Sequence, residues 1–251
     1  MADDRPTAGM TLHRFFVPPD CITGERVVFP PDQAHQIRKV LRLRTGDRVI
    51  ALDGSGAELT VRLEHMGTEI VGAVEERGQN QAEPAACVVL YQGLLKGAKF
   101  ELVLQKCTEI GVSRFVPVTS ARSIPSEPSS ARQQRFETIV REAAEQSGRG
   151  RLPAVSAARP FSSAIQDAVV EGAALLLWED EKIARLRDVV EPSSAAIGLF
   201  VGPEGGFTQR EAELASEAGA RVAGLGSRIL RSETAAMVAS TLVLARLGEL
   251  G

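Results

Sequence analysis

Apolar residues between positions 13 and 75 fall in short runs that Gly, Pro and Asp residues separate. Short runs that are rich in Val, Ile and Phe and bounded by turn residues are typical of β-strands. The pattern predicts strands over residues 13–17, 26–29, 48–52, 59–63 and 70–74. Strands this short and this closely spaced indicate a small β-barrel.

One helix interrupts the predicted barrel. A Pro-Asp pair at 31–32 precedes Ala34, Ile37, Val40 and Leu41, and the spacing of these four places them on one face of a helix. The Arg and Lys residues of the same segment fall on the other faces. The helix and the loop after it therefore carry a basic patch.

Residues 76–86, with the sequence ERGQNQAEPAA, contain no large apolar side chain and include Pro84. Such a segment suits a linker better than a buried element. It divides the chain into an expected first domain, residues 1–78, and an expected second domain, residues 79–251.

Beyond the predicted linker, apolar strand-like runs alternate with amphipathic helices. The strands are expected at 87–91, 115–118, 174–178, 197–201 and 222–225, and the helices at 98–110, 131–147, 183–190, 209–218 and 233–247. This alternation predicts an α/β fold with a parallel sheet covered by helices.

Several of these helices carry signals at their ends. Gly111 is expected to end the first, and Ser130 with Gln133 has the spacing of a capping box before another. The last helix differs, because residues 235–244 leave almost no polar face. We expect it to be buried on all sides, with a second subunit covering part of it.

Composition and charge narrow the class of protein. Apolar residues make up 44% and charged residues 24% of the 251 positions, which is typical of a soluble globular protein. The net charge of −3 argues against attraction of the whole molecule to nucleic acid, but residues 35–48 hold five Arg or Lys against one Asp. Residues 96–151 hold ten Arg or Lys against six Glu. Such runs are most often solvated helix faces, yet the presence of two of them is also consistent with an RNA or DNA partner.

The three cysteines, Cys21, Cys87 and Cys107, lie far apart and form no CxxC pair, so neither a disulfide framework nor a zinc site is expected. The three histidines are dispersed in the predicted barrel, so no metal is expected there either. The start, MADDRPTAGM, is polar and acidic, and no apolar run is long enough to span a bilayer. These features predict no membrane partner and a reducing cytoplasmic location.

Ligands of parallel α/β sheets bind at the carboxyl ends of the strands, so the loops that leave strands are the candidate sites. Two of them stand out, GPEGGFTQRE at 202–211 and GSRILRSETAA at 226–236. Thr208 with Glu211 makes a capping box for the helix after the first loop, and Ser232 is a candidate cap after the second. GPEGG is neither a phosphate-binding P-loop nor a GxGxxG dinucleotide loop. Its residues alone fit a tight turn and a ligand site equally well.

Six ordered strings carry a resemblance over nearly the whole chain. They are HRFFV at 13–17, HQIRKVLRLRTGD at 35–47, LLKGAKFELVLQKCTEIGV at 94–112, REAAEQSGR at 141–149, GPEGGFTQRE at 202–211 and LGSRILRSETA at 225–235. In these strings the chain resembles the RsmE-type 16S ribosomal RNA (uracil-N3) methyltransferases of the SPOUT superfamily. The resemblance implies a PUA-like RNA-binding β-barrel, followed by a SPOUT domain with a C-terminal trefoil knot, in a homodimer.

The resemblance also implies a pocket for S-adenosyl-L-methionine, bounded by the strand end near 177, the GPEGG loop and the loop at 225–231. Glycines would let main-chain groups hold the cofactor closely, so a β-branched residue at Gly205 or Gly206 should abolish binding. The residues expected to bind the cofactor are Leu177, Trp178, Gly202, Pro203, Glu204, Gly205, Gly206, Leu225, Gly226, Ile229, Leu230, Arg231, Thr234 and Ala235.

Methylation of uracil N3 requires loss of its proton and stabilisation of negative charge on the flanking oxygens. Arg231 is the expected cation, with Arg14 as a second one from the barrel or the partner subunit. Glu204 and Glu233 are the candidate bases, but Glu204 is better explained as a loop-fixing acceptor and Glu233 as a partner of the helix dipole.

With only 4% aromatic residues, the chain should hold RNA through phosphates and shape rather than through base stacking. The 16S ribosomal RNA or the small subunit is the expected partner. Two other functions remain open, a SPOUT enzyme that methylates a different base or a ribose oxygen, and a non-catalytic RNA-binding assembly factor. The expected phosphate contacts are Arg14, Arg38, Lys39, Arg42, Arg44, Lys96, Lys99, Arg149 and Arg151.

Overall fold

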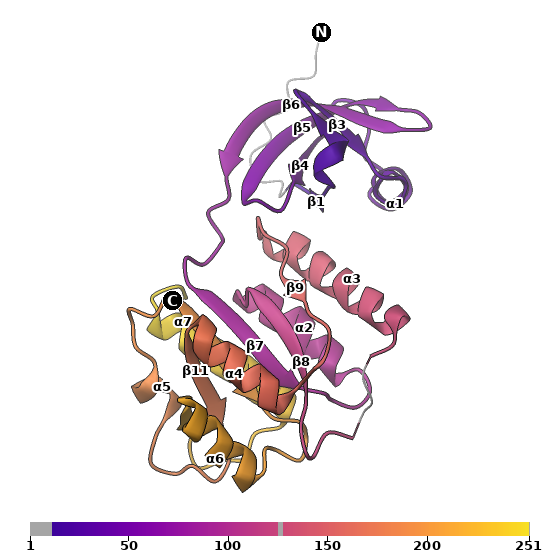
Figure 1. Ribbon diagram of the computed structural model, residues 1–251. Helices are drawn as coiled ribbons and strands as arrows, with labels where there is room; N and C mark the ends of the chain where they lie inside the picture. The colour runs from indigo at the N-terminus through magenta and orange to yellow at the C-terminus, as the bar shows by residue number, and fades with distance from the viewer. Residues whose placement is uncertain (1–11, 125–127, 251) are drawn as a thin grey trace. The chain divides into compact units, whose positions relative to one another are not determined.

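The computed structural model describes residues 12–124 and 128–250, so the polar start of the chain lies outside the described residues. The chain folds into two compact units (Figure 1). The first comprises the described residues up to Glu83 together with Gly148–Arg151, and the second comprises Pro84–Ser147 with the described residues from Leu152 onward. Each unit is described by itself.

The first unit is a six-stranded sheet with a small core. Its strands, in the order β1-β4-β5-β6-β3-β2, pair antiparallel except for the parallel pair β1 and β4. Phe15 and Phe29 lie near opposite ends of this order, yet their rings pack edge to face with centroids 5.8 Å apart. The sheet must therefore curl round, as a barrel does. The strands are β1 (Arg14–Phe16), β2 (Ile22–Thr23), β3 (Arg26–Phe29), β4 (Arg48–Leu52), β5 (Ala57–Met66) and β6 (Ile70–Gln79), and a 3-10 turn, η1 (Pro19–Cys21), precedes β2.

All five strands predicted in this unit are present, but β6 continues through Gln79. The first residues of the predicted linker are therefore strand, because their backbone pairs with β5 from Thr60 back to Ala57. Sequence periodicity could not show this, since the extension is polar and exposed. The short β2 was not predicted.

The predicted basic helix starts as α1 (Pro31–His35) and widens into a π-helical turn, η2 (Gln36–Val40). Leu41 N–H donates to Gln36 O at 2.9 Å, the five-residue spacing that defines such a turn. The wider turn rotates later residues off the predicted face, so Ile37 is buried but Val40 is 66% exposed. Arg42 follows with a φ of 55°, a conformation that a side chain rarely adopts. The prediction that Val40 lies on the buried apolar face of this helix is therefore wrong.

The second unit is an α/β fold around an all-parallel sheet of seven strands. The order is β10-β8-β7-β12-β11-β13, with β9 paired to β8. The predicted parallel sheet is thus confirmed, and β9 and β10 are additions. The strands are β7 (Cys87–Gly93), β8 (Arg114–Thr119), β9 (Ala154–Val155), β10 (Arg159–Pro160), β11 (Ala173–Leu177), β12 (Ala196–Val201) and β13 (Arg221–Ala223).

Helices cover both faces of this sheet (Figure 1). Alternate residues of β7 divide between two cores, with Val88 and Leu90 in one and Val89 and Tyr91 in the other. The first core is closed by α2 (Lys99–Ile110), α3 (Ser130–Ser147), α5 (Leu186–Val189) and α7 (Ser232–Arg246), and the second by α4 (Phe161–Glu171) and α6 (Gln209–Ala218). The sequence prediction missed α4 and made α5 too long.

The ends of these helices test the predicted signals. Gly111 ends α2 with a φ of 119°, as predicted. The cap of α3 lies one residue earlier than predicted, because Ser129 Oγ rather than Ser130 accepts the Arg132 N–H, at 3.4 Å. Helix α7 is buried on one side only within this chain, and Leu242 is 38% exposed on the other.

No helix in the described part of the chain is both long and apolar enough to cross a membrane. The trefoil knot expected for the C-terminal segment stays a prediction.

Candidate functional site

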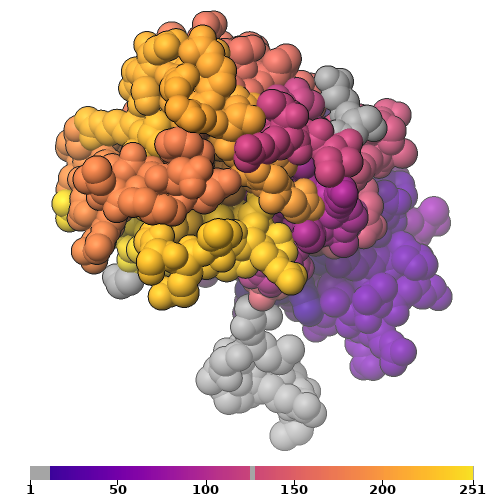
Figure 2. All heavy atoms as spheres, turned by 90° about the horizontal axis from the view of Figure 1, so that it is seen from below, coloured from indigo at the N-terminus to yellow at the C-terminus, as the bar shows by residue number. Residues whose placement is uncertain are grey.

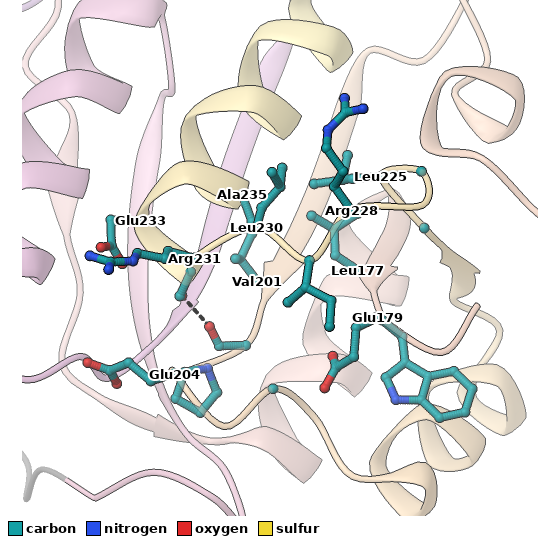
Figure 3. A pocket seen from close by; sticks show the side chains of 18 of the residues that line it. Leu177, Glu179, Val201, Glu204, Leu225, Arg228, Leu230, Arg231, Glu233 and Ala235 are labelled. Atoms are coloured by element: carbon teal, nitrogen blue, oxygen red, sulfur yellow. Dashed lines mark hydrogen bonds between the residues drawn. The ribbon is translucent and has the colours of Figure 1, made fainter. Parts of the chain in front are cut away.

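A cavity of about 470 Å³ opens at the carboxyl ends of β11 and β12, beside the start of α7. Figure 2 views the second unit from this side, where segments far apart in the sequence meet at the surface. Leu177, Val201, Leu225, Leu230 and Ala235 form the apolar walls (Figure 3). The cavity thus lies where parallel sheets bind their ligands.

The GPEGG loop forms one wall of the cavity, and a side chain added at either of two of its glycines would meet a close neighbour. A Cβ on Gly202 would come within 3.0 Å of the Gly206 backbone. Gly206 has a φ of 67°, and its Cβ would lie 2.3 Å from a carboxylate oxygen of Glu179. Gly93 at the end of β7 is equally tight, since its Cβ would meet Pro203 N at 2.4 Å. Backbone packing therefore favours glycine at Gly202 and Gly93, and the left-handed backbone favours it at Gly206.

Helix α6 and the segment after β8 fix the loop from the other side. The predicted capping box is confirmed, because Thr208 Oγ1 accepts the Glu211 N–H and Glu211 accepts the Thr208 N–H at 2.8 Å. The nearly buried Glu211 also accepts the Ala121 N–H at 2.8 Å, and Arg122 donates to Gly205 O at 2.7 Å. These hydrogen bonds anchor both ends of the loop.

The loop after β13 forms the opposite wall. Trp178 N–H donates to Ala223 O at 3.0 Å, and Gly224 N–H donates to Ala184 O at 2.8 Å. A Cβ on Gly224 would collide with Glu181 O at 2.3 Å. This loop is thereby tied to the segment that follows β11.

Gln92 connects the two loops from beneath the cavity. It is fully buried at the end of β7, and its Nε2 donates to Ser232 Oγ at 3.0 Å and approaches the carbonyl oxygens of Gly202 (3.3 Å) and Val201 (3.4 Å). Ser232 Oγ in turn donates to Gly202 O. Ser232 is therefore not the predicted cap of α7, since Arg231 occupies that position without a side-chain cap. Sequence reasoning missed Gln92, which carries no motif.

Glu204 lies at the mouth of the cavity with its carboxylate engaged. It accepts the Lys96 N–H at 3.1 Å and pairs with Lys99 Nζ at 3.3 Å. Partial burial raises the pKa of Glu204, but the hydrogen bonds from the Lys96 and Glu204 N–H groups and from Lys99 outweigh it and lower the pKa below its usual value. A carboxylate held in this way is a weak proton acceptor and a good anchor for the loop.

Arg231 and Glu233 lie together on the side of the cavity opposite Glu179 (Figure 3). Glu233 is 9% exposed, and its Oε2 is buried with no hydrogen-bond partner in the described chain. Arg231 is exposed, and no ion pair within the described residues engages it. A buried carboxylate oxygen without a donor is costly unless a ligand satisfies it.

The predicted cofactor residues mostly gather here. The cavity is lined by all of them except Gly205, which faces Arg122, and Thr234, which is exposed on α7. Sequence reasoning did not name the other lining residues as cofactor contacts, although several follow a strand directly and the strand-end rule could have found them. They are Lys99, Glu179, Lys182, Val201, Gly224, Ser227, Arg228, Ser232 and Glu233.

The predicted phosphate contacts divide into exposed and engaged side chains. Lys39, Arg42, Arg44 and Lys96 are exposed, and so is Arg151, which reaches Ser55 O at 3.4 Å. The engaged set consists of Arg14, paired with Glu58, Arg38, bonded to Gly67 O, and Lys99, paired with Glu204.

Arg149 differs from all of these because its side chain is only 4% exposed and pairs with Glu83 at 3.0 Å. The same carboxylate accepts the N–H groups of Gly150 and Arg151, both at 2.9 Å. A buried guanidinium held by a carboxylate is not available to a phosphate on the surface, so the structure gives Arg149 a structural role instead.

Comparisons with known proteins agree with this geometry. Residues 82–244 match the RNA methyltransferase domain family, and residues 29–73 match the RNA methyltransferase PUA domain family. The chain is 35% identical to ribosomal RNA small subunit methyltransferase E of Synechocystis, over 90% of this chain and 75% of that protein. Identity to the Bacillus subtilis protein of the same name is 31%, over 88% of each chain.

A solved structure of ribosomal RNA small subunit methyltransferase E from Neisseria gonorrhoeae, bound to S-adenosyl methionine, matches with a TM-score of 0.85 and 30% identity. The match covers 94% of this chain and 98% of that one. By sequence and by fold, this chain therefore belongs to the family of RNA methyltransferases that carry the name ribosomal RNA small subunit methyltransferase E.

Proposed function

We propose that this chain methylates N3 of a uracil in 16S ribosomal RNA, with S-adenosyl-L-methionine as the methyl donor. Methylation of small-subunit ribosomal RNA follows from membership of the family, and the uracil N3 position from the six strings shared with the RsmE type. The observation that carries the proposal is the cavity at the carboxyl ends of β11 and β12, bounded by the GPEGG loop and by the loop after β13.

The residues of the cavity fit this cofactor. Leu177, Val201, Leu225 and Leu230 offer apolar surface for an adenine ring. The two glycine-containing loops bring main-chain donors and acceptors to the cavity without intervening side chains. Acidic and basic side chains line the rest of the cavity, and they suit the ammonium and carboxylate of the cofactor's amino acid moiety.

The reaction replaces the N3–H bond of uracil with an N3–C bond, so a proton must leave and negative charge must be stabilised on O2 and O4. When bound, S-adenosyl-L-methionine supplies an electrophilic methyl group. Arg231 is positioned to stabilise the charged uracil oxygens, since no ion pair with a described residue engages it. Of the two candidate bases, Glu233 has a carboxylate oxygen without a hydrogen-bond partner among the described residues. Glu204 is hydrogen-bonded and has a lowered pKa, so its role is to fix the loop. We therefore assign proton acceptance to Glu233.

RNA binding is assigned to the exposed basic residues. Lys39 lies in the π-helical turn of the first unit, Arg42 and Arg44 follow it, and Lys96 lies beside the GPEGG loop. Turns with π geometry are frequent at functional sites, and strained residues such as Arg42, with a positive φ, cluster there as well. Arg14, paired with Glu58, is kept as a second cation for catalysis or RNA, whereas Arg149 is left out.

A homodimer is part of the proposal. Val238 and Leu242 lie on the side of α7 that this chain leaves uncovered, and Leu242 is 38% exposed. Light scattering should give the mass of two chains, and Leu242→Glu should convert the protein to one-chain particles. A wild-type monomer at micromolar concentration would refute the dimer. A cytoplasmic location, where ribosomal RNA is assembled, completes the proposal.

The test is direct. Small ribosomal subunits from a strain that lacks this activity are incubated with the protein and with methyl-labelled cofactor, and the RNA is digested to nucleosides for mass spectrometry. The proposal expects 3-methyluridine. A methylated ribose or another base would support a different SPOUT activity, and no transfer in a single turnover would support the non-catalytic assembly factor.

A further inference from the structure

Glu179 is a charged group of the cavity that no part of the proposed reaction uses. It lies two residues beyond the end of β11, and its carboxylate lies against Gly206, where a Cβ would be only 2.3 Å from one oxygen and 2.6 Å from the other. Lys182, the nearest cation along the chain, donates to the backbone oxygen of Glu179 and not to its carboxylate. Within the described residues, this carboxylate has no hydrogen-bond partner.

The surroundings of Glu179 define which ligand group it could accept. Its carboxylate points into the cavity on the side of Leu177, across from Arg231 and Glu233 (Figure 3). The proposed reaction assigns Arg231 and Glu233 to the uracil, so neither is available to the ribose of the cofactor. On its own side, Glu179 offers two acceptor oxygens in one plane, and two neighbouring hydroxyls can donate to them at once.

We propose that Glu179 binds the 2′- and 3′-hydroxyls of the cofactor's ribose, and that Gly206 is glycine because only a residue without a Cβ leaves room for this carboxylate. The inference rests on the cofactor of the proposed function and adds the group that recognises its ribose. The proposal also accounts for the close approach of the Glu179 carboxylate to Gly206, which has a left-handed backbone with a φ of 67°.

Two nucleosides distinguish a contact of Glu179 with the ribose from a contact with the amino acid end of the cofactor. S-adenosylhomocysteine has both, whereas 5′-methylthioadenosine has the ribose diol and lacks the ammonium and carboxylate. Binding of each is measured by calorimetry without RNA, to the wild type and to Glu179→Gln and Glu179→Ala. Asp180→Asn is the matched control, because Asp180 is the next residue, exposed and outside the lining of the cavity.

Both Glu179 variants should weaken both nucleosides by the same factor, about tenfold or more, because hydrogen bonds to a charged group are lost. Asp180→Asn should bind both as the wild type does. Thermal unfolding of the variants should match the wild type, since Glu179 is exposed and no described residue donates a hydrogen bond to its carboxylate.

A loss confined to S-adenosylhomocysteine would overturn the proposal, because Glu179 would then hold the amino group. Unchanged affinity for both nucleosides would overturn it as well. A wild type that bound neither nucleoside would instead refute the cofactor of the proposed function. A wild type that bound both but made no 3-methyluridine would leave the ribose contact standing, so the two failures are distinct.

Discussion

Replacing Gly206 with alanine should have two separate effects, one on the stability of the fold and one on ligand binding. The first is backbone strain, because an L-residue in the left-handed region costs roughly 1–2 kcal/mol. The second is steric, since the new Cβ would lie 2.3 Å from a Glu179 oxygen and ordinary carbon contacts begin near 3.4 Å. The carboxylate must therefore move by about an ångström, which is enough to break a hydrogen bond. Because that side chain is flexible, folding should survive while ligand binding suffers.

Gly24 provides the matched control for strain. Its φ of 57° is close to the 67° of Gly206, yet nothing lies within 4 Å of its added Cβ, and it is in the first unit. Denaturant unfolding should show a loss of about 1–2 kcal/mol for Gly24→Ala and for Gly206→Ala alike. Calorimetry with S-adenosylhomocysteine should show a loss of about tenfold or more for Gly206→Ala alone.

The same substitution in a Glu179→Ala background sharpens the test. Once the carboxylate is gone, Gly206→Ala should cost little further affinity, because the two changes remove the same contact. Wild-type affinity for Gly206→Ala, or fully additive losses in the double variant, would refute the reasoning.

Four further predictions rest on other contacts. Gln92→Leu and Ser232→Ala should each weaken binding of S-adenosylhomocysteine, and the double variant should lose less than the sum, because both remove one buried link between the two loops; additive losses would show that the link is not shared. Arg149→Ala should lower the free energy of unfolding by about 1.5–3 kcal/mol, because it removes charged hydrogen bonds to the half-buried Glu83 carboxylate, which keeps only the Gly150 and Arg151 N–H donors; a loss under about 1 kcal/mol, typical of exposed pairs, would contradict this. For Glu83, burial raises the pKa, but the Arg149 guanidinium and the Gly150 and Arg151 N–H groups lower it below the ordinary 4.5. Its contribution to stability is therefore present above about pH 4.5 and lost as the pH falls through the lowered value, so Glu83→Gln should flatten the acid limb of a stability profile, and an unchanged limb would refute the assignment. RNA affinity should fall steeply between about 50 and 200 mM salt, less steeply for Arg42→Ala, and a flat response would exclude phosphate contacts.

The sequence by itself determined most elements of both units. Alternation of apolar runs with amphipathic helices predicts a parallel sheet because each helix must bury one face against it, and β12 and α6 lie at the expected residues. The strings GPEGG and LRSETA also located two walls of the cavity, since a strand followed by a glycine-containing loop is a local pattern. Only local periodicity and local end signals are needed for such predictions.

Periodicity failed where the backbone departed from the ordinary helix or strand. Because of the π-helical turn at Gln36–Val40, Val40 lies at the surface and not on the predicted apolar face, and no residue pattern predicts such a turn. Helix α4 was missed because the two strands before it, β9 and β10, are only two residues long and form through pairing with β8.

The tertiary structure alone decided what the charged and polar residues do. Arg149 in a basic stretch looks like a phosphate contact, but folding buries it against Glu83, 66 residues away along the chain. Gln92 and Ser232 are 140 residues apart and meet under the cavity. The physical reason is the same in each case. A hydrogen bond or ion pair forms only between groups that the fold brings within about 3 Å, and no local pattern carries that distance.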